Sequence, residues 1–341
     1  MIKAGVVGAA GYIGGELLRI LTGHPEVDVI AATSARRSGR RVDVEHPNLR
    51  GHTDLSYVAP ADLPRCDVLF FATSSLDDLK LRADLCTRAA VVYDLSPDLR
   101  LTDPDRYALH YGRAHPAPEL LGTPVPGWPE LHREALRSAN LVSVPGCMAT
   151  AATLALLPLA AESLIEPTVT VDGRAGSSGA GASAGEQNIH AERAGVLRVF
   201  APLEHRHQAE ISAATGLDVR MSATGVAAVR GVQVLCRATA RGGVSPAQVR
   251  AAYRQCYRDE PFVRVVAARR GGYRYPEPKL LYGTNYCDVG FAMAQDTREV
   301  LAIGALDNLV KGGAGNAVQC LNIRMGWAEH TGLSFPGLHP I

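Results

Sequence analysis

The stretch IKAGVVGAAGYIGGELLRILT, residues 2–22, predicts a strand, a tight turn and a helix. Its first seven residues are mostly apolar, as in a buried strand of a parallel sheet. Three glycines follow at intervals of three, where they let the backbone approach a pyrophosphate at a helix N-terminus. The sequence therefore predicts a dinucleotide-binding turn. The residues expected to contact the cofactor there are Gly8, Gly11, Tyr12, Ile13 and Gly14.

Strand-like and helix-like segments alternate through the first part of the chain. Apolar strand patterns recur at residues 27–33, 66–73, 90–96 and 141–147. Such alternation is typical of an α/β protein with a doubly wound parallel sheet of the Rossmann type. We therefore expect a dinucleotide-binding domain over residues 1–146.

The pattern changes after residue 146. An apolar helix is followed by longer strands, such as residues 231–240, and by a loop rich in Gly, Ser and Ala. This predicts a second α/β domain with a mixed or antiparallel sheet over residues 147–306. From residue 307 onward, a glycine-rich turn opens a long helix.

Composition limits the classes of function. The 341 residues are 47% hydrophobic and 20% charged, with a formal net charge of +1, which gives no argument for nucleic-acid or membrane binding. The longest apolar run is too short to span a bilayer, and no secretory pattern opens the sequence. The seven cysteines are scattered without a CxxC pair. A soluble protein of the reducing cytoplasm is expected.

The loop after the second strand indicates which dinucleotide binds. An NAD enzyme usually has an acidic residue there for the ribose hydroxyls, but no carboxylate occurs before Asp43. Ser34, Arg36 and Arg37 can instead hold a 2′-phosphate, which favours NADPH/NADP+. The alternative is an ordinary solvated basic loop.

A short-chain dehydrogenase would use the same turn with a Tyr-x-x-x-Lys pair on a helix. The chain has this spacing at residues 275–279, where two prolines interrupt it. Because proline breaks a helix interior, that class is excluded.

Cys147 is the cysteine with the setting of a nucleophile. It follows Pro145 and Gly146 and opens an apolar helix, whose dipole and free amides would stabilise a thiolate. The same amides could hold an oxyanion. The alternative is a cysteine that merely packs at a helix start.

A base for this thiol is available in the segment EHRHQAEI. Strand spacing would put His205 and His207 on one face, and histidine is the usual partner of a cysteine nucleophile. A metal site is the weaker interpretation, because no nearby Cys/His pair completes a tetrahedral set. The loop at residues 176–181 has the backbone freedom to approach a cofactor or a phosphate, or to be a simple linker.

A series of motifs runs through nearly the whole chain. After the glycine turn come HPNLRG (46–51), DLSPDLRL (94–101), PGCMAT (145–150), SSGAG (177–181), HRH (205–207), VRG (229–231), GTNYCDVG (283–290) and DNLVKGGAGNAVQ (307–319). In this order the chain resembles the N-acetyl-gamma-glutamyl-phosphate reductase family. It looks most similar to the branch that acts on a LysW-type amino-group carrier protein in lysine biosynthesis.

The resemblance implies NADPH-dependent reduction of an acyl phosphate to a semialdehyde through a thioester, in a homotetramer. It implies that residues 307–341 carry a helix that returns to the first domain. It assigns Cys147 as the nucleophile and His207 as the acid/base, with the choice between the two histidines left open. The residues assigned to the substrate and its phosphate are His205, Arg206 and Arg113. The further residues assigned to the cofactor are Ser178, Gly179, Ala180, Gly181 and Asn308.

The HPNLRG and PGCMAT segments favour a substrate borne by an acidic carrier protein. A basic rim for this carrier is expected from Arg193, Arg198, Arg269 and Arg270. Two departures from the family pattern point to an altered substrate pocket: Thr73-Ser74-Ser75 replace Pro-His-Gly, and a histidine expected before VRG is missing. The alternatives are the N-acetylglutamyl phosphate reductase of arginine biosynthesis and a dinucleotide-sensing regulator without catalysis.

Overall fold

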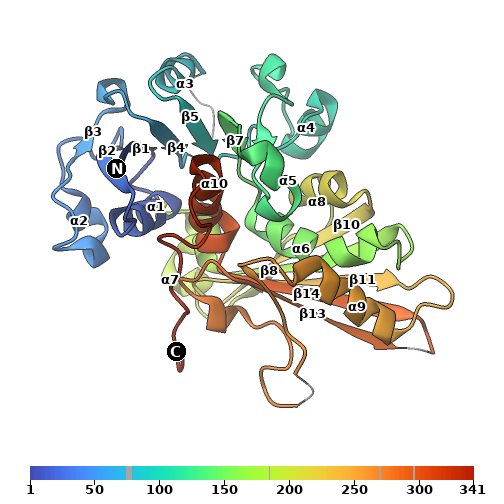
Figure 1. Cartoon of the computed structure of the whole chain (residues 1–341). Coiled ribbons are helices and arrows are strands. Elements are labelled where there is room, and N and C mark those ends of the chain that lie inside the picture. Colours follow the sequence, from blue (N-terminus) through green and yellow to red (C-terminus); the bar gives the residue numbers. More distant parts are fainter. Residues whose placement is uncertain (74–78, 184, 269, 295) are drawn as a thin grey trace. The chain divides into compact units, whose positions relative to one another are not determined.

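The chain forms two compact units. The computed structural model describes residues 1–73, 79–183, 185–268, 270–294 and 296–341, without the side chains of residues 79–81 and 187. The first unit comprises Met1–Pro145 and Gly313–Ser334, and the second comprises Gly146–Gly312 and Phe335–Ile341 (Figure 1). The C-terminal segment expected from residue 307 is therefore divided between the units.

The first unit is built on a parallel sheet with strand order β3-β2-β1-β4-β5-β7-β6. All of its strand pairs are parallel, and β4 is buried along its whole length, as expected when helices cover both faces. The doubly wound sheet predicted from the sequence is confirmed. Its strands are β1 (Ile2–Val7), β2 (Val27–Thr33), β3 (Tyr57–Val58), β4 (Val68–Phe71), β5 (Val91–Asp94), β6 (Val125–Pro126) and β7 (Leu141–Ser143).

Helices surround this sheet, and one of them comes from the end of the chain. The helices are α1 (Tyr12–Thr22), α2 (Val42–Glu45), α3 (Leu79–Cys86), α4 (Pro104–Tyr111), α5 (Pro129–Leu136) and α10 (Gly315–Met325). Helix α10 packs against α1 and α5. The buried His24 fixes this arrangement through a 3.0 Å hydrogen bond between its Nε2 and Asn322 Oδ1. A π-helical segment, Val310–Ala314, stands where the sequence predicts a glycine-rich turn.

The second unit is built on a mixed sheet with strand order β12-β13-β14-β11-β8-β10-β9. The pairs β8/β10 and β12/β13 are parallel, and the other pairs are antiparallel. The predicted mixed sheet is thus confirmed. Its strands are β8 (Thr168–Ala175), β9 (Leu197–Ala201), β10 (Asp218–Val226), β11 (Val232–Thr239), β12 (Val263–Val265), β13 (Cys287–Ala294) and β14 (Glu299–Leu306).

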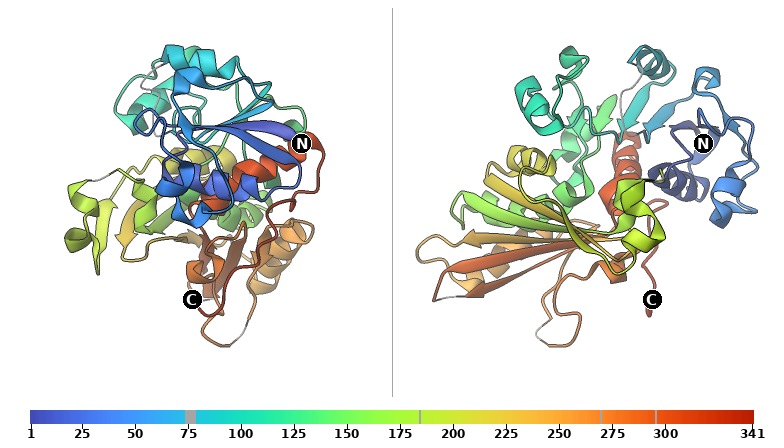
Figure 2. Two further views of the ribbon diagram at one scale, coloured as in Figure 1. Left: turned by 90° about the vertical axis from the view of Figure 1, so that its left-hand side faces the viewer. Right: turned by 180° about the vertical axis from the view of Figure 1, so that it is seen from behind.

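An apolar helix forms the core of the second unit. Helix α6 (Cys147–Ala161) packs on β11, β14 and β13, with α8 (His207–Thr215) and α9 (Pro246–Tyr257) beside it (Figure 2). Almost every residue of α6 after Cys147 is buried, which explains why the sequence is apolar on all sides. The short helix α7 (His190–Arg193) precedes β9. Burial thus fixes the helix whose first residue is Cys147.

Candidate active site

The glycine turn in the first unit fits a dinucleotide. Gly8 has a φ of +76°, which a side chain would strain, and a Cβ on Gly14 would come within 2.6 Å of Ala9 Cα. Gly11 is the N-cap of α1, so the amides of Tyr12, Ile13 and Gly14 form the first turn, where intrahelical acceptors are lacking. This is the geometry that binds a pyrophosphate. The amides at residues 12–14 are therefore the groups that would hold the cofactor's phosphates.

The HPNLRG segment has a structural role at this turn. His46 Nε2 donates a hydrogen bond to Ala9 O at 2.8 Å, and the imidazole packs so closely on α1 that a Cβ on Gly15 would be 2.5 Å from its Cε1. The histidine therefore supports the glycine turn from the side of α1. In the sequence this motif indicates only a branch of the family.

The loop after β2 keeps a basic character, but its arginines differ. Arg36 is exposed, whereas Arg37 Nε lies 3.2 Å from Glu45 Oε2, and Arg40 Nη1 lies 3.0 Å from Glu45 Oε1. Asp43 is paired with Arg41, which lowers the pKa of this carboxyl group. Ser34 is half-buried and its amide donates to Val58 O. The first carboxylates after β2 are thus engaged by arginines.

Cys147 lies at the N-terminus of α6, as the sequence predicts. Gly146 is the N-cap, and the Cys147 side chain is partly buried. Burial raises the pKa of the Cys66 thiol to about 11 and also raises the pKa values of Cys86 and Cys236. These three thiols are kept protonated and lie away from any helix start. Cys147 is thus distinguished from them by its position.

His207 packs directly on Gly146, the residue before Cys147. A Cβ on Gly146 would overlap His207 Nε2, so a glycine is required where the imidazole reaches the start of α6. The His207 residue is only 4% exposed. The imidazole is therefore held beside the helix end that carries the thiol.

The expectation that His205 and His207 share one face of a strand is wrong. His207 is the first residue of α8, and strand β9 ends earlier, at Ala201. A spacing of two residues fits the turn before a helix as well as it fits a strand. The two rings nevertheless meet edge to face, with centroids 4.6 Å apart, and the His207 amide donates to His205 Nδ1. Arg206, between them, is exposed.

Two residues that the sequence analysis missed complete this site. Glu210 is buried, and its Oε2 accepts a 2.8 Å hydrogen bond from the Gly146 amide, while Oε1 lies 3.9 Å from His207 Nε2. On the other side, a Cβ on Gly312 would be 2.5 Å from Cys147 Cβ. The spacing of three between His207 and Glu210 in a helix could have signalled the contact between these two side chains. The approach of Gly312 depends on long-range packing.

The SSGAG loop and Asn308 are brought together. The Asn308 amide nitrogen donates to Ser178 Oγ at 3.0 Å, and Asn308 Oδ1 accepts from the Gly231 amide at 2.7 Å. Ser178 and Asn308 are both buried, so these polar groups fix the loop at Ser177–Ala180. A cofactor role for Ser178, Gly179, Ala180, Gly181 and Asn308 stays a prediction.

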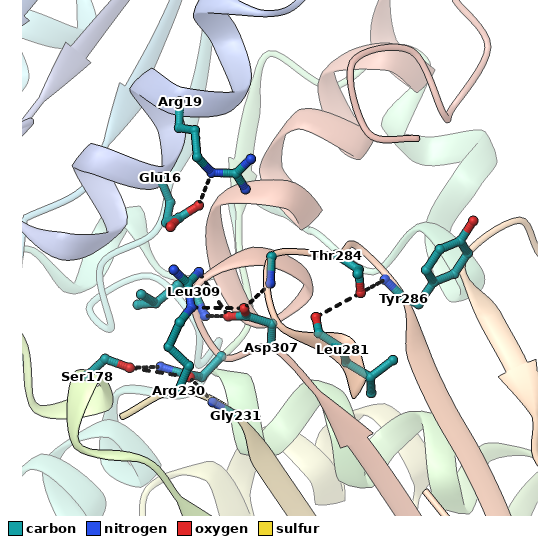
Figure 3. Close-up of polar contacts among 12 residues, drawn as sticks. Glu16, Arg19, Ser178, Arg230, Gly231, Leu281, Thr284, Tyr286, Asp307 and Leu309 are labelled. Carbon is teal, nitrogen blue, oxygen red and sulfur yellow. Dashed lines mark hydrogen bonds and ion pairs between the residues drawn. The ribbon is translucent and has the colours of Figure 1, made fainter. Parts of the chain in front are cut away.

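Asp307 joins three of the sequence motifs (Figure 3). This fully buried carboxylate is paired with Arg230 of the VRG segment, with Nε 3.0 Å from Oδ2. It also accepts from the amides of Gly283 and Leu309 at 2.6 and 2.8 Å. The network therefore anchors the segment that leads to Gly312 beside Cys147.

The remaining predicted residues are placed as follows. Arg113 lies in the first unit with its Nη2 3.6 Å from Asp98 Oδ1, and its substrate role stays a prediction. Arg193 and Arg198 lie on α7 and β9, whereas Arg270 follows β12, the strand at the opposite edge of the sheet. Arg269, Ser74 and Ser75 lie outside the described residues.

Over the described part of the chain, no three His, Cys, Asp or Glu side chains are placed to hold a metal ion, and no helix could cross a membrane.

Comparisons with known proteins agree with this architecture. Residues 3–139 match the family model "Semialdehyde dehydrogenase, NAD binding domain", and residues 147–308 match "Semialdehyde dehydrogenase, dimerisation domain". Among solved structures, aspartate semialdehyde dehydrogenase II from Vibrio cholerae has a TM-score of 0.70 at 16% identity, covering 96% of this chain and 98% of that one. This likeness shows the shared fold.

Curated relatives are much more similar in sequence. The "[LysW]-L-2-aminoadipate 6-phosphate reductase" of Deinococcus radiodurans is 45% identical, over 98% of this chain and 97% of the relative. A "Putative [LysW]-L-2-aminoadipate/[LysW]-L-glutamate phosphate reductase" of Cenarchaeum symbiosum is 43% identical over the full length of both. The chain therefore belongs to the semialdehyde dehydrogenase family, in the group of these phosphate reductases.

Proposed function

We propose that this protein reduces a carrier-protein-linked acyl phosphate, of aminoadipate or glutamate, to the semialdehyde with NADPH. The observation that carries the proposal is the start of α6, where Cys147 is flanked by Gly146, with His207 packed on it, and by Gly312. The names of the full-length relatives support the substrate class. Reduction of an acyl phosphate through a thioester needs a thiol nucleophile, and Cys147 is the first residue of α6.

The side chains of the second unit account for the covalent steps. The Cys147 thiolate attacks the acyl carbon, a C–S bond forms, and the bond to the phosphate oxygen breaks as inorganic phosphate leaves. The first amides of α6 stabilise the oxyanion. The dinucleotide, when bound, supplies the hydride that reduces the thioester. His207 gives a proton to the resulting alkoxide and takes it back as the C–S bond breaks and the aldehyde leaves.

Glu210 is assigned to positioning these groups. Its carboxylate holds the Gly146 amide and lies beside His207 Nε2, so it fixes the imidazole relative to the start of α6.

NADPH is proposed over NADH on the basis of the loop after β2. Arg36 is exposed, and the nearby acids Asp43 and Glu45 are occupied by Arg41, Arg37 and Arg40. A carboxylate that would bind ribose hydroxyls is thus replaced by guanidinium groups, which bind a 2′-phosphate. The family model for the same unit supports a nicotinamide dinucleotide.

The test is turnover with defined substrates. Carrier-linked aminoadipyl and glutamyl phosphates and N-acetylglutamyl phosphate are compared, each with NADPH and with NADH, by absorbance of the reduced cofactor. The proposal expects phosphate release and aldehyde formation in equal amounts, with the carrier-linked compounds preferred. Equal efficiency with the N-acetyl compound would assign the arginine pathway, and absence of turnover with all of them would favour a regulator.

Self-association is part of the proposal. The match to a dimerisation domain in the second unit supports an oligomer, and a homotetramer is expected. Sedimentation equilibrium measures this directly, since the chain mass is 36.2 kDa.

A further inference from the structure

Asp307 is the first residue after β14, and its carboxylate is bound on both oxygens. The carboxylate is fully buried, and Arg230 binds it in bidentate fashion, with Nε 3.0 Å from Oδ2 and Nη2 3.3 Å from Oδ1 (Figure 3). The amides of Gly283 and Leu309 donate to the same two oxygens. A buried charge that is paired and hydrogen-bonded in this way has a well-defined position.

The backbone of Asp307 holds the segment that contacts the nucleophile. Its carbonyl oxygen accepts hydrogen bonds from the amides of Val310 and Gly312, at 3.2 and 3.0 Å. The bond from Gly312 has the i→i+5 spacing of a π-helix, a rare conformation that is frequent at functional sites. Gly312 packs on Cys147, where its Cβ would be 3.1 Å from Cys147 Cα. Asp307 and Cys147 are thus linked through one hydrogen bond and one close contact.

Strand β14 holds α6 at a second point. Gly304 of β14 lies so close to Ala151 O that a Cβ on this glycine would overlap the oxygen. Cys147 and Ala151 are one turn apart on α6, which packs on β14. Both contacts depend on glycine, because a side chain at Gly304 or Gly312 would push the helix away. With α6 fixed at Ala151, the contact on Cys147 depends on how Asp307 holds Gly312.

We propose that Asp307, held by Arg230, is a positioning residue that seats the Cys147 thiol at the amides of the first turn of α6. This inference rests on the proposed function, because it concerns the nucleophile of that reaction. The free amides at a helix N-terminus stabilise a thiolate only while the sulfur lies beside them. Gly312 closes the space on one side of Cys147 Cβ and so restricts the positions of the thiol. Asp307 acts through Gly312 rather than on the substrate.

The experiment measures the reactivity of the thiol separately from turnover. Asp307→Asn keeps the size of the side chain and removes its charge, whereas Arg230→Lys keeps the charge but loses the bidentate contact. The matched control is Asp288→Asn, because Asp288 is another buried carboxylate of the second unit, bound in bidentate fashion by Arg264 at 2.7 and 3.2 Å. Alkylation of Cys147 by iodoacetamide is followed by peptide mass spectrometry across a pH series, beside kcat, KM and the melting temperature.

In Asp307→Asn, kcat should fall about tenfold or more and KM should change less than about threefold, because a misplaced nucleophile slows the reaction more than it weakens binding. The pH at which alkylation of Cys147 reaches half of its maximal rate should rise by about half a pH unit or more, since the thiol leaves the stabilising amides. Arg230→Lys should show smaller changes in the same directions. Asp288→Asn should lower the melting temperature and leave kcat and the alkylation profile as in the wild type.

The direction of the pH shift separates positioning from a direct effect of charge. Removing a negative charge near a thiol favours the thiolate. An effect of the Asp307 charge through space would therefore move the alkylation profile of Asp307→Asn to lower pH. A shift in that direction would overturn the positioning role.

Two further results would overturn it. Wild-type kcat and alkylation in a folded Asp307→Asn would show that the carboxylate only stabilises the fold, and equal losses in Asp288→Asn would show a general loosening of the second unit. If Asp307→Asn does not fold, Arg230→Lys decides between these outcomes. The proposed function fails separately: a wild type that reduces none of the acyl phosphates would remove it, while an alkylation profile of Cys147 that still depends on Asp307 would support the positioning role.

Discussion

Glycines have different roles at two helix N-termini, that of α1 in the first unit and that of α6 in the second. At the dinucleotide turn, the nearest atom to a Cβ on Gly11 would be Gly8 O at 3.5 Å, so the helix N-terminus stays open to a ligand. At the start of α6, the spaces at Gly146 and Gly312 are filled by His207 and by Cys147 itself. The first arrangement leaves space for a bound molecule, whereas the second brings the side chains of Cys147 and His207 to the same helix end. Small substitutions should therefore have very different consequences in the two places.

Replacing His207, the proposed acid/base, should have the largest effect. His207→Asn should lower kcat about a hundredfold or more, because a general acid/base contributes on that scale. Dinucleotide affinity should be unchanged, since the glycine turn belongs to the first unit. His205→Asn should raise KM more than it lowers kcat. Steady-state kinetics and a fluorescence titration of NADPH distinguish these effects, and the opposite pattern would exchange the roles of the two histidines.

Gly146→Ala should have the next largest effect. The added methyl group displaces His207 and disturbs the hydrogen bond from the Gly146 amide to Glu210. A shift of about 1 Å in a reacting group can cost roughly a hundredfold in kcat. The control is Gly242→Ala, where a Cβ meets nothing within 4 Å. Near-normal kcat in Gly146→Ala would contradict the close packing at this residue.

The loop after β2 should show a smaller, selective effect. Arg36→Ala should weaken NADPH binding about tenfold, as expected for loss of one charge-assisted contact, and leave NADH binding nearly unchanged. Arg37→Ala should weaken it less, because Glu45 already engages that guanidinium. Equilibrium titrations with both cofactors measure this. Equal losses for NADH and NADPH would show that the loop does not bind the 2′-phosphate.

The smallest expected effect concerns pH and the stability of the first unit. Burial lowers the pKa of His24 below 6.5, so the folded state favours the neutral ring, which accepts from the Glu26 amide and bonds Asn322. Its contribution is present above pH about 6.5 and is lost as the pH falls through the lower folded pKa. His24→Gln should flatten the fall in melting temperature below pH 6.5. If the melting temperature of His24→Gln falls with pH as that of the wild type does, His24 is not the source of the fall.

The parts of this molecule that the sequence predicts correctly are those that are local. The dinucleotide turn is a contiguous strand, turn and helix, so its spacing of glycines is visible directly. The start of α6 is equally local, because Pro145 and Gly146 precede an apolar run that must be buried. Both could be predicted because neighbouring residues determine them.

The rest required the tertiary structure. The spacing of His205 and His207 is compatible with a strand or with a helix start, and only the packing of α8 on α6 selects between them. Glu210 contacts Gly146 across 64 residues, and Gly312 approaches Cys147 from the far end of the second unit. Likewise, the pairing of Arg37 with Glu45 depends on how the loop folds back. No local pattern encodes such contacts.

The most direct test of the account is to detect the acyl group on Cys147. The protein is mixed with carrier-linked acyl phosphate in the absence of NADPH, quenched in acid and digested for peptide mass spectrometry. The account predicts one equivalent of released phosphate and the acyl mass on the peptide containing Cys147, discharged when NADPH is added. Cys147→Ser should release no phosphate. Turnover by the serine variant, or an acyl group on another residue, would contradict the covalent mechanism.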